Sequence, residues 1–156
     1  MTIFVGKKEY ESSYTFLKRA YYVRYGSIIT QDSIFYNKYG KPYFKEKNKP
    51  FFSISHSGEY IACVFSDNEI GLDIQRVKSI PENVAHRFLH TNSSDKKERT
   101  IEWTKFESYG KQKGIGIPFN DNYYKGNFII SEIISGYIIT VCMEKDLNQE
   151  LELVFI

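Results

Sequence analysis

Two apolar runs in the middle of the chain constrain its fold more than any other feature. EYIACVFS, residues 59–66, predicts a buried strand, and IGLDI, residues 70–74, predicts a second strand after a short turn. Alternate residues of a strand face opposite sides, so the three aliphatic side chains of IGLDI share one face, and Gly71, Asp73 and Gln75 share the other. The sequence therefore predicts a sheet with a packed core on one face and a carboxylate on the other.

Helical patterns precede and follow these strands. Residues 12–25 and 95–113 have helical periodicity, and a glycine follows each segment as a stop signal. The other expected elements are a strand over 2–6, a loop around Pro42 and Pro50, a short helix with Ser79 and Glu82 in a capping box, and strands over 126–134, 136–143 and 151–156, the first two joined by a Ser135-Gly136 turn. This order predicts a single α+β domain, residues 1–156, with two similar halves, about 1–68 and 69–156, and antiparallel strands.

Composition narrows the class of protein. A hydrophobic fraction of 42% and a charged fraction of 26% are typical of a globular domain. The two cysteines lie in apolar runs without a CxxC motif, so we expect neither a zinc site nor a disulfide framework. The first residues contain no signal-peptide core, and no apolar run approaches membrane-spanning length, so we expect a cytoplasmic protein without a membrane partner.

Charge is distributed unevenly along the chain. Residues 1–50 carry ten Lys or Arg against four Asp or Glu, whereas residues 51–156 carry eleven against fifteen. This asymmetry indicates that the first third meets an anionic partner. A solvated, lysine-rich surface is the alternative that composition leaves open.

The segment 95–113 places three chemically distinct side chains on one face of the predicted helix. Trp103, Glu107 and Lys111 are separated by four residues each. Alone, this spacing is more typical of an exposed ion pair beside a half-buried tryptophan. Asp73, however, lies on the polar face of a strand, near a glycine that permits a close approach. A strand carboxylate and a helix carboxylate that converge would suit Mg²⁺.

Three blocks of sequence occur in an order that is specific. They are GKPYF with FSISHSG, then GLDIQ, then WTKFESYGKQKGIG. Together they resemble the signatures of the 4′-phosphopantetheinyl transferases of the Sfp type, and the resemblance extends over most of residues 12–145. Without it, His56 reads as a surface histidine in a polar turn. The resemblance implies the pseudo-twofold fold of that family, in which two similar halves form one domain.

The resemblance also implies an activity. The family transfers the 4′-phosphopantetheine arm of coenzyme A to a serine of an apo acyl or peptidyl carrier protein, depends on Mg²⁺ and releases 3′,5′-ADP. Matched to the family motifs, Asp73, Glu107 and Gln75 would hold the metal, and Glu107 would act as general base. Lys111 would stabilise the leaving phosphate. The residues that would bind coenzyme A are Arg24, Lys41, Ser55, His56 and Lys111.

The chain departs from the family pattern at two places that bear on the site. Gln75 stands where the family has a second carboxylate, which predicts a weaker metal site. Phe106 stands where the family has a lysine, and Gly110 follows it one helical turn later. Because these positions are helical neighbours, we expect Phe106 to fill the room that Gly110 leaves. The chain is also shorter than typical members, chiefly before residue 12 and between Asp73 and Trp103.

Two other functions are compatible with the sequence. Gln75, Phe106 and the shorter chain motivate the first of them, a non-catalytic relative that binds coenzyme A or a carrier protein. The basic, tyrosine-rich first third is compatible with a nucleic-acid-binding module, but the sequence contains no recognisable nucleic-acid-binding motif, so we expect no nucleic-acid partner. Because both halves are expected within one chain, we expect a monomer.

Overall fold

The computed structural model describes residues 1–9, 11–89, 91–119, 125–134, 136–145 and 150–156. Its helical segments are α1 (Ser13–Tyr25), η1 (Gln31–Ser33), α2 (Glu82–Val84), η2 (Ala85–Leu89) and α3 (Lys96–Lys113). Its strands are β1 (Thr2–Lys7), β2 (Ile34–Tyr36), β3 (Pro42–Phe44), β4 (Phe51–Ser57), β5 (Tyr60–Ser66), β6 (Ile70–Arg76), β7 (Asn127–Ile134), β8 (Tyr137–Met143) and β9 (Glu152–Phe155).

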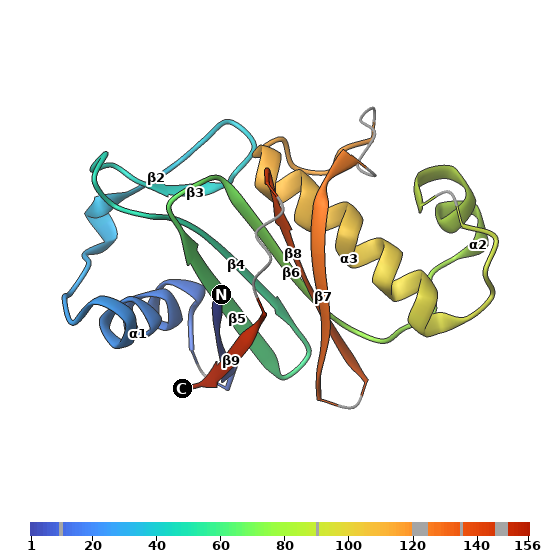
Figure 1. Ribbon diagram of the computed structural model, residues 1–156, viewed down its shortest axis with the longest axis horizontal. Helices are drawn as coiled ribbons and strands as arrows, with labels where there is room; N and C mark the ends of the chain where they lie inside the picture. Colours follow the sequence, from blue (N-terminus) through green and yellow to red (C-terminus); the bar gives the residue numbers. More distant parts are fainter. Residues whose placement is uncertain (10, 90, 120–124, 135, 146–149) are drawn as a thin grey trace.

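Two sheets form the centre of the molecule, with α1 beside one and α3 beside the other (Figure 1). The first sheet has the strand order β4-β5-β1-β9, and the second has the order β6-β8-β7. Strands β2 and β3 form a separate two-stranded ribbon. The succession β1-α1-β4-β5 in the first half matches β6-α3-β7-β8 in the second, and corresponding strands pair antiparallel. The predicted α+β class with antiparallel sheets is therefore confirmed, and the pseudo-twofold relation stays a prediction.

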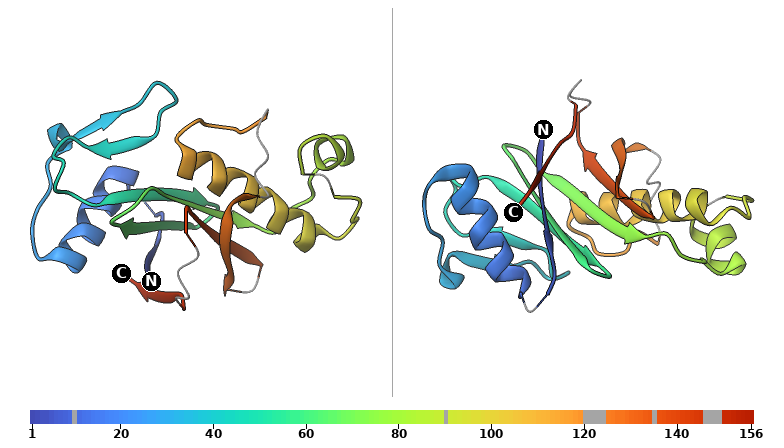
Figure 2. Two further views of the ribbon diagram at one scale, coloured as in Figure 1. Left: turned by 45° about the horizontal axis from the view of Figure 1, so that its top comes forward. Right: turned by 90° about the horizontal axis from the view of Figure 1, so that it is seen from below.

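The chain termini meet in the first sheet, a feature that the sequence pattern did not predict. The last strand, β9, pairs parallel to β1, with Thr2 opposite Glu152 and Val5 opposite Phe155. The first and last strands accordingly run side by side (Figure 2). Alternation of apolar and polar residues predicts a strand and its two faces, but it does not predict the neighbouring strand. The sequence therefore predicted the last strand but not its pairing with β1.

The two long helices begin and end at residues that suit those positions. The Ser12 side chain accepts a hydrogen bond from the Thr15 backbone at the start of α1, and Asp95 accepts one from Glu98 at the start of α3. Each helix ends at a glycine with a positive φ of 66°, Gly26 or Gly114, as the sequence predicts. The capping box predicted at Ser79 is wrong, because α2 begins after Pro81 and receives no side-chain cap.

Three apolar cores hold the layers together. The central core lies between the sheets and includes Ile3 and Val64 from the first with Leu72 and Val141 from the second. A second core, rich in phenylalanine, joins α1 to its sheet. A third joins α3 and η2 to β8. The central core fixes one half against the other, so residues of β4 and β6 stay in fixed register across the junction.

Helix α3 lies unusually close to β6, because Gly71 faces it. A Cβ atom at Gly71 would lie 1.9 Å from the Ser108 carbonyl oxygen and 2.4 Å from the Gln112 nitrogen. The close approach that the sequence predicts at Gly71 is therefore made by a helix backbone. Gly110 likewise accommodates backbone, since its Cβ would lie 1.9 Å from the Gly116 carbonyl oxygen. The expectation that Phe106 fills that room is thus wrong.

Candidate active site

A cleft of about 620 Å³ opens where the two halves meet. The volume is within the range of small-molecule sites. Both halves line it, and its polar lining includes Lys41, Ser55, His56, Asp73, Gln75, Glu107 and Lys111. The structure thus brings together every predicted site residue except Arg24. That residue lies at the end of α1, outside this lining, with its guanidinium 5.9 Å from the centre of the Tyr25 ring.

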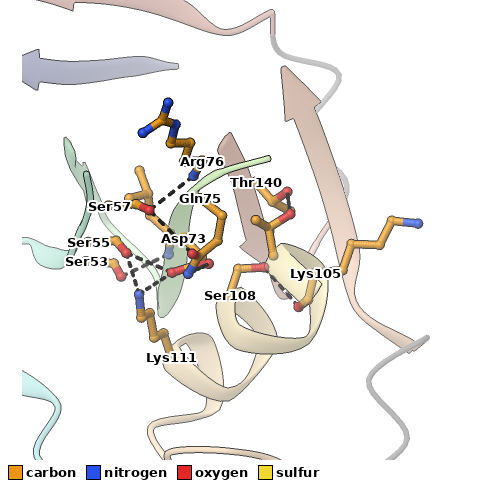
Figure 3. Close-up of polar contacts among 12 residues, drawn as sticks. Ser53, Ser55, Ser57, Asp73, Gln75, Arg76, Lys105, Ser108, Lys111 and Thr140 are labelled. Atoms are coloured by element: carbon orange, nitrogen blue, oxygen red, sulfur yellow. Dashed lines mark hydrogen bonds and ion pairs between the residues drawn. The ribbon is translucent and has the colours of Figure 1, made fainter. Parts of the chain in front are cut away.

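Asp73 is the centre of a hydrogen-bond network at the base of the cleft (Figure 3). Its side chain is fully buried. The Lys111 ammonium donates to Asp73 Oδ1 at 2.7 Å and to Ser55 Oγ at 2.8 Å, and Ser55 Oγ donates to the same carboxylate oxygen at 2.7 Å. A buried carboxylate is stable only with such compensation. The three residues come from β4, β6 and α3, so the network spans the junction of the halves.

Alternate serines of β4 form what we call the serine seam, Ser53, Ser55 and Ser57. Ser53 Oγ accepts a hydrogen bond from the Leu72 backbone at 2.9 Å, and Ser57 Oγ accepts one from the Arg76 backbone at 3.1 Å. Both contacts connect residues 19 positions apart, so β4 and β6 are aligned in one register. The middle serine instead turns to Asp73. The seam therefore joins the exposed backbone edge of β6 to the first half and supplies one residue to the site.

Gln75 faces Asp73 with its nitrogen. Its Nε2 donates to Asp73 Oδ2 at 3.2 Å, and its Oε1 accepts from Ser57 Oγ at 3.4 Å. The sequence predicts that the Gln75 carbonyl oxygen either ligates the metal weakly or holds a metal-bound water. In the structure this oxygen is directed to the serine seam, and ligation would require the amide to turn over. Gln75 here fixes the orientation of the Asp73 carboxylate.

Glu107 lies beside Asp73, and this proximity changes its acidity. Burial, the charge of Asp73 and a hydrogen bond with the Asp73 side chain together raise the pKa of Glu107 to about 7, whereas the charge of Lys111 opposes the shift. The carboxylates of Asp73 and Glu107 thus share the base of the cleft with the Lys111 ammonium. The arrangement is electrostatically favourable to an additional cation.

The donor set at the base of the cleft fits Mg²⁺. Within the described part of the chain, no cluster of three or more His, Cys, Asp and Glu side chains forms a ready-made metal site. Mg²⁺ does not need one, because it is commonly held by one or two carboxylates, water and phosphate oxygens. Asp73 and Glu107 supply two hard oxygen donors, and the charge of Asp73 disfavours the charged form of Glu107. The residues present therefore match the predicted ion, with Lys111 as the resident cation.

His56 lies at the end of β4, on the outer part of the cleft, beside a lysine that the motifs did not indicate. The Lys8 ammonium lies 3.0 Å from His56 Nδ1. Burial lowers the pKa of His56, and the nearby charges of Lys8 and Lys111 lower it further. The strand continues through this residue, since β4 runs to Ser57 and the turn begins at Gly58, whose φ is 54°. His56 therefore belongs to the end of a strand that turns at Gly58, as the resemblance implies, and the alternative of a histidine in a polar turn is wrong.

Lys41, expected to bind the nucleotide, is largely committed to the protein. Its side chain is 7% exposed, and its ammonium forms an ion pair with Glu69. It also lies 3.3 Å from the backbone oxygens of Ile70 and of Gln112. Burial lowers the pKa of Lys41, and the Glu69 carboxylate opposes that shift. Lys41 therefore connects the first half to the start of β6 and to the end of α3.

Two aromatic residues from the long-helix motif lie in the third core. Phe106 is 2% exposed, and its ring centre lies 5.9 Å from that of Trp103. Trp103 is half-buried, as the spacing along the helix predicts when it is considered alone. These aromatics support α3 from the side opposite Gly71 and leave Glu107 and Lys111 to face the cleft.

Sequence reasoning missed three kinds of residue around the site. Ser53 and Ser57 of the serine seam had a visible signal, since they alternate with Ser55 along a strand and so share its face. Lys8 had only the basic charge of the first third as a signal. Glu69 had none, because its ion pair with Lys41 depends on tertiary packing alone. None of the helices in the described ranges is long and apolar enough to cross a membrane.

Comparison with known proteins agrees with the resemblance in the motifs. No family model matches the chain. It is 32% identical over 124 aligned residues to the 4′-phosphopantetheinyl transferase gsp of Aneurinibacillus migulanus, covering 71% of this chain and 52% of that relative. It is 36% identical over 90 residues to the 4′-phosphopantetheinyl transferase Sfp of Bacillus subtilis (strain 168), covering 51% of this chain and 40% of that protein.

The chain is a homologue of the Sfp-type 4′-phosphopantetheinyl transferases. It spans about half the length of these curated relatives, 52% of one and 40% of the other. The phosphopantetheinyl transferase motifs of the chain are the segments that line the cleft: residues 40–44, 52–58, 71–75 and 103–116 each contribute at least one side chain or backbone to its wall. The segments that resemble the family motifs are therefore the segments that form the wall of the cleft.

Proposed function

We propose that the chain transfers the 4′-phosphopantetheine arm of coenzyme A to a serine of an apo acyl or peptidyl carrier protein, with Mg²⁺ as cofactor and 3′,5′-ADP as the second product. The observation that carries this proposal is the convergence of Asp73, Glu107 and Lys111 in a cleft between the halves. Homology to named phosphopantetheinyl transferases supports it. In the proposed fold, the two similar halves are related by a pseudo-twofold axis, and the cleft lies at their junction.

Asp73 and Glu107 would hold the metal, which when bound would neutralise the charge of the pyrophosphate. Asp73 is suited to this task because Ser55 and Gln75 fix both of its oxygens. Because the Asp73 side chain is fully buried, its carboxylate has little freedom to rotate. Gln75 therefore contributes as a positioning residue, while direct ligation by Gln75 stays a prediction.

Glu107 is suited to accept the proton of the acceptor serine. Its pKa, raised to about 7 by burial and by Asp73, lies near neutral pH, where proton transfer by a general base is most effective. Lys111 lies one helical turn further along α3 and is 31% exposed in its side chain. Its ammonium would leave Asp73 for the phosphate on the departing nucleotide, to which it would donate charge-assisted hydrogen bonds.

The basic first third is consistent with coenzyme A as donor, because that molecule carries three phosphate groups. We further propose a cytoplasmic monomer that acts on carrier proteins and on neither nucleic acids nor membranes. The donor-binding contribution of Lys41 would be limited to its cleft-facing surface, since its ammonium is paired with Glu69. Ser55 and His56 would make the principal contacts with the nucleotide.

The transfer itself is tested by intact-mass analysis of apo carrier proteins. Incubation with the chain, coenzyme A and Mg²⁺ should add the mass of one phosphopantetheine group, and EDTA should prevent the gain. Glu107→Gln should lose at least about 100-fold in rate, whereas Glu102→Gln on the same helix, whose carboxylate pairs with Lys105 outside the cleft, should transfer normally. Unmodified acyl and peptidyl carriers after prolonged incubation at high enzyme concentration would refute the proposal.

A second function, binding of coenzyme A or of a carrier protein without transfer, is favoured by one observation. Lys111 neutralises Asp73 and Gln75 directs its amide nitrogen toward it, so the carboxylate is satisfied without a metal. Calorimetry separates the two functions. Coenzyme A binding that is unchanged by EDTA, together with unmodified carriers, would support the binding protein, and Mg²⁺-dependent mass gain would exclude it.

A further inference from the structure

The turn between β2 and β3 forms one wall of the cleft. We call residues 36–42 the ribbon tip, and Tyr36, Tyr39, Lys41 and Pro42 of this segment line the cleft. The ribbon is a sheet of its own, and its tip extends toward the end of α3 (Figure 1). Within the tip, which the structure describes completely, Lys41 is the one buried residue. The position of this wall therefore depends mainly on polar contacts and not on an apolar core.

Polar contacts with two distant segments hold the ribbon tip. Asn37 Nδ2 donates to the carbonyl oxygen of Gly114, at the end of α3, at 2.8 Å. The Lys41 ammonium pairs with Glu69, the residue before β6, and lies 3.3 Å from one backbone oxygen of β6 and from one of α3. An ammonium has three N–H donors, and these three acceptors can take all of them. The donors of Lys41 are therefore committed to holding the tip.

Glu69 contacts the ribbon at a second residue, Tyr43 of β3. Burial, the charge of Glu69 and a hydrogen bond with its side chain together raise the pKa of Tyr43 to about 12. The Glu69 side chain is 36% exposed and lies outside the lining of the cleft. Glu69 can therefore influence a ligand in the cleft through the ribbon, without contacting that ligand.

We propose that Glu69 is a positioning residue for the donor: by holding Lys41, and with it Tyr43, it fixes the ribbon tip as a wall of the cleft and so determines the affinity for coenzyme A. The inference rests on the proposed function, because it takes coenzyme A as the donor. A buried ammonium that loses its carboxylate is poorly compensated, so the tip would move to bring it to water. A displaced wall fits the donor less well, whereas the reactive groups belong to β6 and α3 and keep their places.

Isothermal titration calorimetry with coenzyme A and transfer kinetics of the full chain test the proposal. Glu69→Gln should weaken coenzyme A binding, and raise the KM for it, by about 5-fold, while kcat stays within about 2-fold of wild type. A merely structural role would not give this split, because partial unfolding lowers the concentration of active enzyme, and with it the apparent kcat, but leaves KM unchanged. Thermal unfolding of each variant identifies a temperature at which all of them are folded.

Glu132→Gln is the matched control. Its carboxylate is 37% exposed, almost the same as that of Glu69, and pairs with Lys97 outside the lining of the cleft. This variant should change neither the affinity for coenzyme A nor kcat by more than about 2-fold. Equal losses of affinity in Glu69→Gln and Glu132→Gln would overturn the inference.

The Lys41→Met background tests the route by which Glu69 acts. Because the effect passes chiefly through Lys41, Glu69→Gln should weaken coenzyme A binding less than about 2-fold in that background. The same 5-fold loss there, or coenzyme A binding by Glu69→Gln as tight as that of wild type or tighter, would overturn the inference and leave the proposed function intact. A wild-type chain that binds coenzyme A but transfers nothing would overturn the proposed function, and calorimetry would still decide the role of Glu69. A wild-type chain that binds no coenzyme A would overturn both.

Discussion

The two halves of the molecule use the same order of elements but place their helices against their sheets in different ways. Helix α1 contacts its sheet through large apolar side chains, among them Phe16, Leu17 and Tyr21. Helix α3 meets β6 and β8 through small or polar residues as well as through the third core: Ser108 and Gln112 face Gly71, and Thr104 contacts Thr140. The difference brings the backbone of α3 against β6, so that Lys111 and Glu107 reach Asp73. Helix α1 therefore contributes apolar side chains to a core, whereas α3 contributes Glu107 and Lys111 to the cleft.

Corresponding glycines express this contrast. A Cβ atom at Gly6 of β1 would meet a side chain, Phe16 Cε2 at 2.5 Å, whereas one at Gly71 of β6 would meet the backbone of α3 at 1.9 Å. A side chain can shift within its core, but a helix backbone can move only as a unit. The position of α3 therefore depends on Gly71 more than the position of α1 depends on Gly6.

The largest expected effect is that of Gly71→Ala. We expect it to lower the free energy of unfolding by about 3 kcal/mol or more, because α3 must move away from β6. Gly6→Ala is the matched variant and should cost about 1–2 kcal/mol, since the nearest atom belongs to a side chain. Chemical denaturation of both variants measures the difference. Equal losses in the free energy of unfolding for the two variants would contradict this difference between the halves.

An intermediate effect is expected at Lys41, which connects the halves. Lys41→Met should lower the free energy of unfolding by about 2 kcal/mol, because Glu69 and two backbone oxygens lose a shared donor. Lys38→Met, an exposed lysine in the same loop whose ammonium lies over the Tyr39 ring, should cost less than about 0.5 kcal/mol. Urea denaturation measures both. A Lys41→Met protein as stable as wild type would mean that this lysine serves the ligand and not the junction.

The smallest effect concerns two thiols at corresponding places in the halves. Cys63 on β5 and Cys142 on β8 are both buried under a helix, in the second and third cores. Burial raises the pKa of the Cys63 thiol and raises that of Cys142 to about 12, so neither forms an appreciable thiolate at pH 8 in the folded protein.

Because the central core joins the sheets, we expect the halves to unfold together. Cys63→Ser and Cys142→Ser variants, each retaining one thiol, should then react with a thiol reagent at rates within about 3-fold of each other in mild denaturant, after correction for any difference in stability. Mass spectrometry of the labelled protein follows both rates. Much faster labelling of one thiol would indicate that its half opens separately.

The sequence predicted those parts of the molecule that depend on local pattern. A glycine stop predicted the end of α3, and the alternation of IGLDI placed Asp73 opposite the apolar face. The motifs singled out Asp73, Glu107, Lys111, Ser55 and His56, and the structure places all five in the lining of one cleft. Each of these features is encoded within a short segment or in the order of segments.

Features that depend on contacts between distant segments were not predicted. Lys41 is buried because Glu69, 28 residues away, lies beside it in the fold. Gln75 directs its nitrogen to Asp73 because Ser57 of another strand donates to its oxygen. Arg24, a predicted ligand of coenzyme A, lies outside the lining of the cleft. The helical repeat predicts which face of α1 carries Arg24, but it does not predict the direction in which that helix packs. Residue type and spacing do not specify these partners.

The central claim is that a reaction site lies at the junction of the halves with Asp73 as its fixed point. The most direct test is the rate of phosphopantetheine transfer by Asp73→Asn, measured by intact mass with coenzyme A, Mg²⁺ and an apo carrier protein. We expect the variant to remain folded by circular dichroism and to lose at least about 100-fold in rate, because the amide cannot replace the carboxylate. A folded Asp73→Asn protein that transfers at the wild-type rate would contradict the account.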